Sequence, residues 1–106
     1  MTNIERTLID ITVRPVYSGG VSEVLKAFIL ARERVSVNRL AAMFKKLAFI
    51  YPYHQAIGFY LERAGYRSSS LDLFRRIPRE FDFYLEHGLK EKEYVKEWRL
   101  FIPKWL

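Results

Sequence analysis

The sequence contains no cysteine, and its 106 residues include only four prolines and five glycines. Without thiols the chain can form no disulfide bond and supply no thiolate nucleophile, which excludes disulfide-stapled domains and cysteine catalysis. No apolar run approaches the roughly 20 residues that a membrane-spanning helix requires. The first residues, with Glu5 and Asp10 among them, do not resemble a signal peptide. We therefore expect a soluble cytoplasmic protein that has no membrane partner.

Motifs that support catalysis are missing as well. His54 and His87 lie far apart and have neither a cysteine companion nor the HExxH spacing of zinc enzymes. The Gly19-Gly20 pair lacks the lysine of a phosphate-binding P-loop, and no nucleophile-elbow motif surrounds Ser68–Ser70. The sequence therefore predicts no enzyme, no cofactor and no metal ion. An enzyme would need a site that the sequence does not display, such as a pocket that joins His54 to carboxylates.

Half of the residues are apolar and 16% are aromatic, enough for one domain to bury a core without disulfide bonds. Helical periodicity runs through residues 3–76 and predicts about four helices plus a short fifth. The period changes to two at residues 81–86 and 98–102, which predicts two strands. We expect these strands to pair as a C-terminal antiparallel β-hairpin over residues 80–103, so that residues 1–106 form a single α+β domain.

Several residues mark the ends of the predicted helices. Ser36 is a suitable N-cap for the third helix, and Pro52 suits the first turn of the fourth. Gly58 falls in the middle of that fourth helix, where a close helix crossing would justify it. Gly65 is a C-cap candidate. We expect Ser68–Ser70 to form a loop in which one serine caps the short fifth helix.

An isolated two-stranded sheet is marginally stable, so the predicted hairpin needs further cover. One interpretation is that it packs on the helices. The other is that it presents an exposed strand edge, which a second copy of the chain would close. The second interpretation predicts a homodimer through the hairpin edge.

The run ERTLID at residues 5–10 is followed closely by Arg14-Pro15 and then by Ser18-Gly19-Gly20. Thr2 and Glu5 have the spacing of a capping box, which predicts a helix beginning here. Proline disfavours helical geometry in the residue before it, so the helix should end near Arg14. The glycine pair permits backbone angles that are closed to other residues.

The charged residues of this block have the spacing of an ion-pair network. Asp10 precedes Arg14 by four residues, the favourable orientation for a helical ion pair, and Arg6 is an alternative partner. We interpret the block as a structural motif made of Glu5, Arg6, Asp10, Arg14, Pro15, Gly19 and Gly20.

This block resembles the central segment of the AbiEi family, whose members are antitoxins and autorepressors of type IV toxin–antitoxin systems. Val21–Arg32 is similar to the family helix that follows the double glycine. In Ala56–Glu62, Gly58 and Leu61 take the places of matching family residues. The resemblance covers residues 4–66 and, more loosely, residues 80–102, where the segment from Trp98 to Pro103 is similar to a closing strand.

The resemblance implies a non-enzymatic antitoxin or transcriptional-regulator domain of an abortive-infection system. Its functional partner would be a nucleotidyltransferase-like toxin. Family members usually carry a winged helix-turn-helix domain ahead of this segment, and here Met1 stands only three residues before Ile4. That departure puts sequence-specific DNA binding and autorepression by this chain in doubt.

The net charge of +6 is unevenly distributed. Residues 1–66 carry nine basic and five acidic side chains, residues 67–79 carry four and one, and residues 80–106 carry five and six. Such a basic excess attracts phosphate backbones, although the same residues would also keep helix faces in water. The alternative function is therefore a stand-alone basic module that binds DNA or RNA. The residues that we expect to touch nucleic acid are Arg39, Lys45, Lys46, Arg63, Arg67, Arg75, Arg76 and Arg79.

Overall fold

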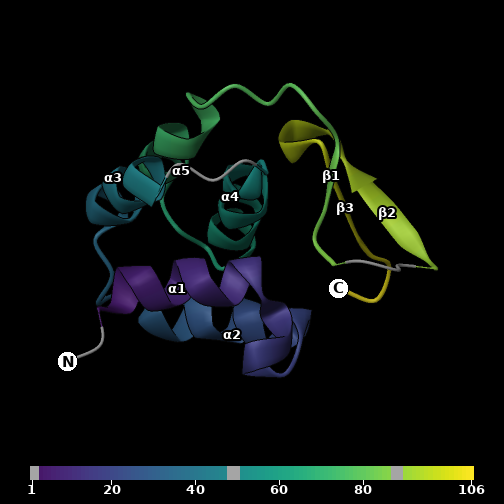
Figure 1. The fold of residues 1–106 in the computed structure, drawn as a ribbon, viewed down its shortest axis with the longest axis horizontal. Helices are drawn as coiled ribbons and strands as arrows, with labels where there is room; N and C mark the ends of the chain where they lie inside the picture. The colour runs from purple at the N-terminus through teal and green to yellow at the C-terminus, as the bar shows by residue number, and fades with distance from the viewer. Residues whose placement is uncertain (1–2, 48–50, 87–89) are drawn as a thin grey trace.

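The computed structural model describes residues 3–47, 51–86 and 90–106, and it confirms the α+β class (Figure 1). The described residues form five α helices and a short 3₁₀ helix: α1 (Ile4–Val13), η1 (Pro15–Ser18), α2 (Val21–Ala31), α3 (Val37–Leu47), α4 (Tyr53–Arg63) and α5 (Ser68–Arg75). Three strands and a second 3₁₀ helix follow: β1 (Phe83–Tyr84), β2 (Lys92–Val95), η2 (Lys96–Trp98) and β3 (Leu100–Pro103). Within these described ranges, every helix is too short or too polar to cross a bilayer.

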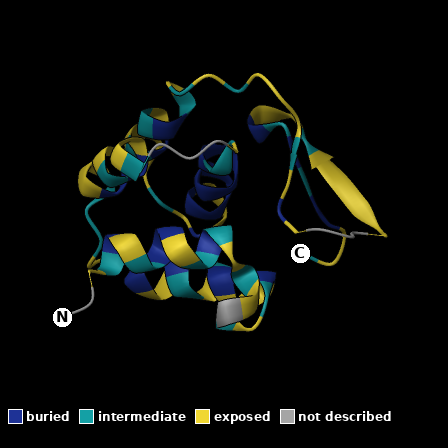
Figure 2. Cartoon of the chain, viewed as in Figure 1, coloured by how far each residue is buried: buried dark blue, intermediate teal, exposed yellow. Residues whose placement is uncertain are grey.

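The central element of the core is α4. All of its residues from His54 to Leu61 are buried, and Figure 2 shows this helix almost entirely in dark blue. α1 packs against α2, α3 and α4, whereas α5 packs against α3 and α4. Phe28 of α2 stacks on Tyr60 of α4 with the ring centroids 5.2 Å apart. The apolar stripes of the helices therefore meet around α4, and each large apolar side chain buried there contributes roughly 1.5–3 kcal/mol.

The start of α1 differs from the predicted capping box. The N-cap is Asn3, whose side-chain oxygen accepts hydrogen bonds from the backbone N–H groups of Glu5 and Arg6, at 2.9 and 3.3 Å. The buried carboxylate of Glu5 instead accepts a hydrogen bond from the backbone N–H of Ser36, 3.2 Å away. Thr2, the predicted cap, lies outside the described residues. This difference has a tertiary cause, because Ser36 at the start of α3 lies close enough to α1 to donate a hydrogen bond to the Glu5 carboxylate.

The rest of the N-terminal block forms a helix and a tight turn. The recorded ion pair of α1 joins Arg6 to Asp10, with 3.0 Å between Nε and Oδ1. Pro15 is the first residue of η1, and α1 ends just before it at Val13, close to the predicted end near Arg14. Gly19 and Gly20 have φ values of 97° and 116°, which residues with a side chain rarely adopt. The N–H of Gly20 donates to the carbonyl of Pro15 over 2.9 Å, which closes the turn.

Two of the predicted caps are confirmed. The hydroxyl of Ser36 accepts a hydrogen bond from the backbone N–H of Arg39 over 3.3 Å, so it caps α3. Gly65 follows Ala64, the C-cap residue of α4, with a φ of 85°, and the N–H of Tyr66 donates to the carbonyl of Leu61 over 3.0 Å. This is the Schellman arrangement that glycine favours at a helix C-terminus.

Two other helix ends are shifted from their predicted positions. Pro52 is the N-cap residue of α4 rather than part of its first turn. Ser68–Ser70 do not form a loop, because they are the first turn of α5, and Arg67 is its N-cap residue. Serine competes poorly in helix interiors but is tolerated in a first turn, where its side chain lies next to unpaired backbone N–H groups.

The sheet contains one more strand than predicted and has a mixed topology. The strand order is β1-β3-β2, in which β2 and β3 form an antiparallel hairpin and β1 runs parallel to β3. The prediction that the strand near residue 83 pairs antiparallel with the strand near residue 101 is therefore wrong. The segment between them, for which no strand was predicted, itself pairs with β3 as β2. Since both faces of β2 are largely exposed, it shows no apolar alternation that would identify a strand.

One face of the sheet packs on the helices through a tryptophan. Leu100 and Ile102 of β3 and Trp98 of η2 are fully buried. The six-membered ring of Trp98 lies directly against Gly58 of α4, and Trp98 Nε1 donates to Glu62 Oε1 over 3.2 Å. The predicted reason for this glycine was a helix crossing, and the structure corrects it. The backbone of α4 comes close to an aromatic ring, which no side chain on residue 58 would permit.

The edge strand β2 bears on the predicted homodimer. Pairing two β2 strands antiparallel about a twofold axis sets residues of one face opposite residues of the same face. With Tyr94 on that axis, Lys92 faces Lys96 of the second copy, and with Glu93 on the axis two glutamates face each other. Like charges directly opposite one another destabilise strand pairs by a few tenths of a kcal/mol to about 1 kcal/mol. Charges of this kind on an edge strand disfavour its pairing with a second copy. The homodimer stays a prediction.

Candidate nucleic-acid interface

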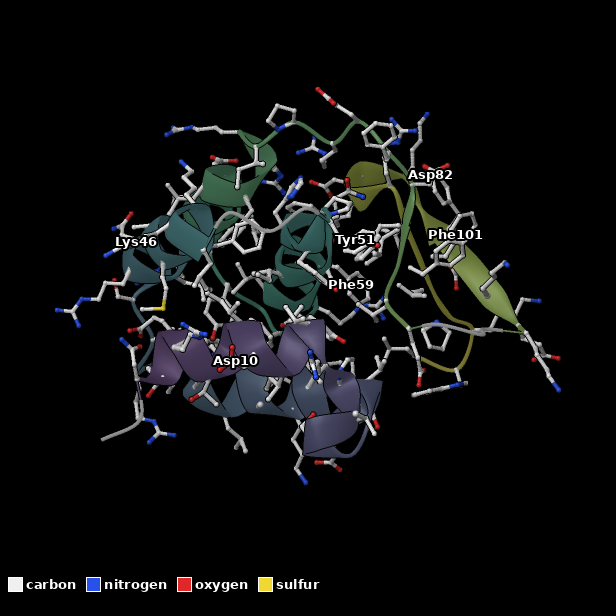
Figure 3. The ribbon with its side chains drawn as sticks, viewed as in Figure 1. Asp10, Lys46, Tyr51, Phe59, Asp82 and Phe101 are labelled. Atoms are coloured by element: carbon white, nitrogen blue, oxygen red, sulfur yellow. The ribbon has the colours of Figure 1, made fainter. Side chains whose placement is uncertain are left out.

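The predicted basic residues do not form one surface, but two of them meet at a groove. Lys45, in the last turn of α3, and Arg76, directly after α5, both line a hollow of about 520 Å³. Lys46 follows Lys45 on the exposed side of α3 and is labelled in Figure 3. Arg39 lies near the start of the same helix and is also exposed. From Val37 to Leu47, α3 therefore carries three cations and no acidic residue.

Two exposed aromatic side chains border this groove, which we call the Lys45–Arg76 groove. Tyr51 is 62% exposed and Phe81 is 68% exposed. The Tyr51 ring lies 6.3 Å from the Tyr53 ring and 6.4 Å from the Phe83 ring, centroid to centroid, so contacts with its neighbours hold it in place. Most large apolar side chains of this chain are buried. Two exposed rings beside two cations therefore make a surface suited to a ligand with flat rings and negative charge.

His54 and Pro78 both line the groove, and a hydrogen bond joins them. The Nε2 of His54 lies 2.9 Å from the carbonyl oxygen of Pro78, which ties the segment after α5 to α4. Burial is the main cause that lowers the pKa of His54, and the hydrogen bond to Pro78 opposes it. Among the described residues, no three His, Asp or Glu side chains form a group that could hold a metal ion. His87 lies outside the described residues.

Arg75 and Arg79 are engaged in holding the fold. The Arg75 guanidinium donates to Asp72 over 2.8 Å and to Glu97 over 2.7 Å, which ties α5 to η2. Arg79 Nη1 donates to the backbone carbonyl of Arg75 over 2.8 Å. Both guanidinium carbons lie over the Trp98 ring, 5.9 and 5.5 Å from its centroid. Two carboxylates largely neutralise Arg75, so it adds little to an attractive field.

Arg63 and Arg67 lie away from the Lys45–Arg76 groove. Arg63 donates to the backbone carbonyl of Leu106 over 3.1 Å, and its guanidinium carbon lies 5.0 Å from the Phe59 ring centroid. Arg67 lines a different hollow of about 770 Å³, together with Arg32, between the starts of α3 and α5. The predicted set thus divides into a groove pair, a helix face, a structural pair and two separate sites.

A third hollow lined by cations, besides those of Lys45 and Arg67, lies at the start of β3, and the sequence analysis did not predict it. Arg79, Lys96 and Arg99 line a hollow of about 540 Å³ together with Glu97. Lys96 and Arg99 belong to the segment with a net negative charge, so the charge distribution along the chain concealed them.

Two glutamates next to Trp98, Glu62 and Glu97, share a side-chain hydrogen bond. Burial, followed by a hydrogen bond with Glu97, raises the pKa of Glu62. Glu97 is the same residue that pairs with Arg75. The pair therefore links α4, η2 and α5, and we assign it a structural role.

Comparison of this chain with protein-family models, with curated proteins and with solved structures finds no match. The likeness to AbiEi antitoxins therefore depends on the sequence resemblance alone, which is carried mainly by the block at residues 5–20.

Proposed function

We propose that this protein is a non-enzymatic regulator that binds nucleic acid through the Lys45–Arg76 groove. The observation that carries the proposal is that these two cations, which are far apart in the sequence, line one groove together with the exposed rings of Tyr51 and Phe81. Phosphate groups would contact the cations. Bases would stack on the rings, which is sequence-tolerant because every base has a flat face.

The charge of α3 supports this proposal. Arg39 and Lys46 extend the positive potential from the groove along an exposed helix that has no acidic residue. An excess of cations on one surface raises the local concentration of a polyanion and releases its counterions on binding. The affinity should therefore fall steeply as the salt concentration rises.

The test is the affinity for a fluorescently labelled oligonucleotide, measured by anisotropy over a series of salt concentrations. The variant Lys45→Ala/Arg76→Ala should bind on the order of tenfold more weakly, and its salt slope should fall by roughly 0.7 for each lost contact to a single strand. The control variant Lys26→Ala/Lys90→Ala removes the same charge from two exposed residues remote from the groove along the chain. Equal losses in both variants would show non-specific attraction only, and binding that ignores salt would refute the proposal.

A second candidate function, antitoxin activity, is favoured by the block at residues 5–20. In this block Glu5 holds the start of α3 and the glycine pair shapes the turn before α2. The protein would then act in the cytoplasm and counter a nucleotidyltransferase-like toxin, with nucleic-acid binding as its means of regulation. The test is growth of cells in which the toxin gene beside this one is induced with and without the chain. Restored growth would support the antitoxin role, and continued arrest with soluble, folded protein would count against it.

A further inference from the structure

Three aromatic rings lie side by side on the face of the sheet that points away from the helices. Each comes from a different strand: Tyr84 from β1, Phe101 from β3 and Tyr94 from β2. The strand register sets both tyrosines directly across from Phe101, and their ring centroids are each 5.0 Å from its centroid. Figure 3 shows Phe101 at the sheet, at the opposite end of the molecule from Lys46.

This aromatic strip is accessible. Tyr84 is 43% exposed and Tyr94 is 42% exposed, whereas Leu100 and Ile102, which alternate with Phe101, are buried on the helix side. In Figure 1 the described helices lie together on one side of the sheet. The strip is thus an outward-facing set of rings in a chain that buries most of its large apolar side chains.

Cations border the strip on two sides. Lys92 Nζ lies 5.4 Å from the Tyr84 ring centroid and 5.5 Å from the Phe101 ring centroid. At the other end is the hollow lined by Arg79, Lys96 and Arg99. A ligand that stacks on the rings would therefore bring attached negative charge close to ammonium and guanidinium groups.

Hydrogen bonds fix the end of the strip next to the hollow. The Asp82 carboxylate accepts from the Tyr94 hydroxyl over 2.7 Å and from Arg99 Nε over 3.1 Å. Arg99 also donates to the backbone carbonyl of Glu80 over 2.8 Å. Asp82 is thus paired with a cation, as Glu97 of the hollow is with Arg75, and the Tyr94 ring is held in place before any ligand arrives.

The segment of residues 76–84 connects this face to the Lys45–Arg76 groove. Along it Arg76 and Phe81 line the groove, Arg79 lines the hollow, and Tyr84 begins the aromatic strip. Two cations and three rings therefore lie along the connection from α5 to β1, together with the acidic Glu80 and Asp82; it is drawn in green in Figure 1.

We infer that the aromatic strip binds unpaired bases, so that the nucleic acid taken by this protein is a single strand of RNA or DNA. This inference rests on the proposed function and narrows its substrate class. In a duplex the faces of the bases are stacked on one another, and they cannot lie on protein rings without unpairing. A single strand can run from the groove along residues 76–84 and place successive bases on the three rings.

The experiment compares binding of a labelled thymidine or uridine 12-mer with binding of a matched hairpin duplex. The single strands should bind on the order of tenfold more tightly than the duplex. The variant Tyr84→Val/Phe101→Val keeps β-favouring side chains but removes two rings. It should lose affinity for the single strand by about one to two orders of magnitude, since each stacked base contributes roughly a factor of 5 to 150. The control Tyr84→Phe/Phe101→Tyr keeps both rings and should stay within about twofold of the wild type.

A second measurement needs no variant. Ultraviolet crosslinking of the thymidine 12-mer to the wild-type protein, followed by peptide mass mapping, should place crosslinks within residues 82–104. If the valine variant and the wild type bind equally and crosslinks fall only near Lys45 and Arg76, the inference is overturned and the proposed function stands. If no oligonucleotide binds, the proposed function fails and the inference fails with it.

Discussion

Replacing Gly58 by alanine tests how the sheet is joined to the helices. A β-carbon built on Gly58 falls 2.6 Å from Cε3 of the Trp98 ring and closer still to two further ring atoms. The ring cannot swing away easily, because Trp98 is fully buried, its Nε1 is bonded to Glu62, and two guanidinium groups lie over it. The overlap must therefore be relieved by moving η2 away from α4.

The expected magnitude follows from two opposing effects. Alanine is favoured over glycine in a helix interior by about 1 kcal/mol. Forcing an extra methyl into a packed core costs about 1–3 kcal/mol, and an overlap with three atoms of a rigid ring belongs at the upper end of that range. We expect Gly58→Ala to lower the free energy of unfolding by about 2 kcal/mol, which for a domain of this size lowers the Tm by roughly 8 °C.

The measurement is thermal and urea unfolding of Gly58→Ala, Trp98→Phe and the double variant. The smaller phenylalanine ring should leave room for the methyl, so the double variant should be at least ~1 kcal/mol more stable than the sum of the single effects predicts. A Gly58→Ala protein that is as stable as the wild type or more stable would refute the reasoning, because helix propensity would then dominate. Strictly additive effects would also refute it, since they would show that the two sites do not touch.

Three further changes test other contacts. Glu5→Ala should destabilise the fold by about 1–3 kcal/mol because it leaves the partly buried backbone N–H of Ser36 without its acceptor. Asp10→Ala breaks a pair whose members are both more than half exposed, so it should cost under ~1 kcal/mol. Urea unfolding that ranks the two variants in the reverse order would contradict this. Tyr60→Phe should leave stability unchanged or raise it, because the buried Tyr60 hydroxyl has no hydrogen-bond partner among the described residues, and a clear loss in urea unfolding would reveal a partner. Burial lowers the pKa of His54 below its ordinary value of 6.5. The stability that neutral His54 contributes is therefore complete above about pH 6.5 and declines as the pH falls toward the folded-state pKa. The variant His54→Gln should lose that decline when unfolding is measured between about pH 7.5 and pH 5.

The helical part was predictable because its signals are local. The apolar stripes, the Ser36 and Gly65 caps, and the turn at Pro15 depend on residues within one or two helical turns, and the structure confirms them. The start of α1 was not predictable in the same way. A capping box needs its glutamate to turn back on its own helix, and here Glu5 is used by Ser36 across the fold.

The sheet was less predictable because its pairings are not local. β2 reads Lys-Glu-Tyr-Val and lies largely exposed at the edge of the sheet, so it lacks the alternation of buried apolar and exposed polar residues that identifies a strand. Once β2 takes the antiparallel place beside β3, the other side of β3 is open to β1, and the long connection allows parallel pairing.

The candidate site shows the same division. The excess of cations on α3 and after α5 is visible in the sequence, and so is the charge of each residue. Their grouping is not, because Lys45 and Arg76 come together through packing of α5 on α3, and Arg75 is neutralised through its contact with η2.

The sequence by itself determined an α+β chain with five helices, the turn at Pro15, the caps at Ser36 and Gly65, a basic net charge, and the absence of thiol chemistry, since these depend on composition and on short-range periodicity. Only the tertiary structure decided the strand order, the contact of Gly58 with Trp98, the division of the basic residues and the strip formed by Tyr84, Phe101 and Tyr94. The physical reason is that these features depend on contacts between residues distant along the chain. Many partners satisfy the local pattern equally well, and the packing of the whole domain selects one.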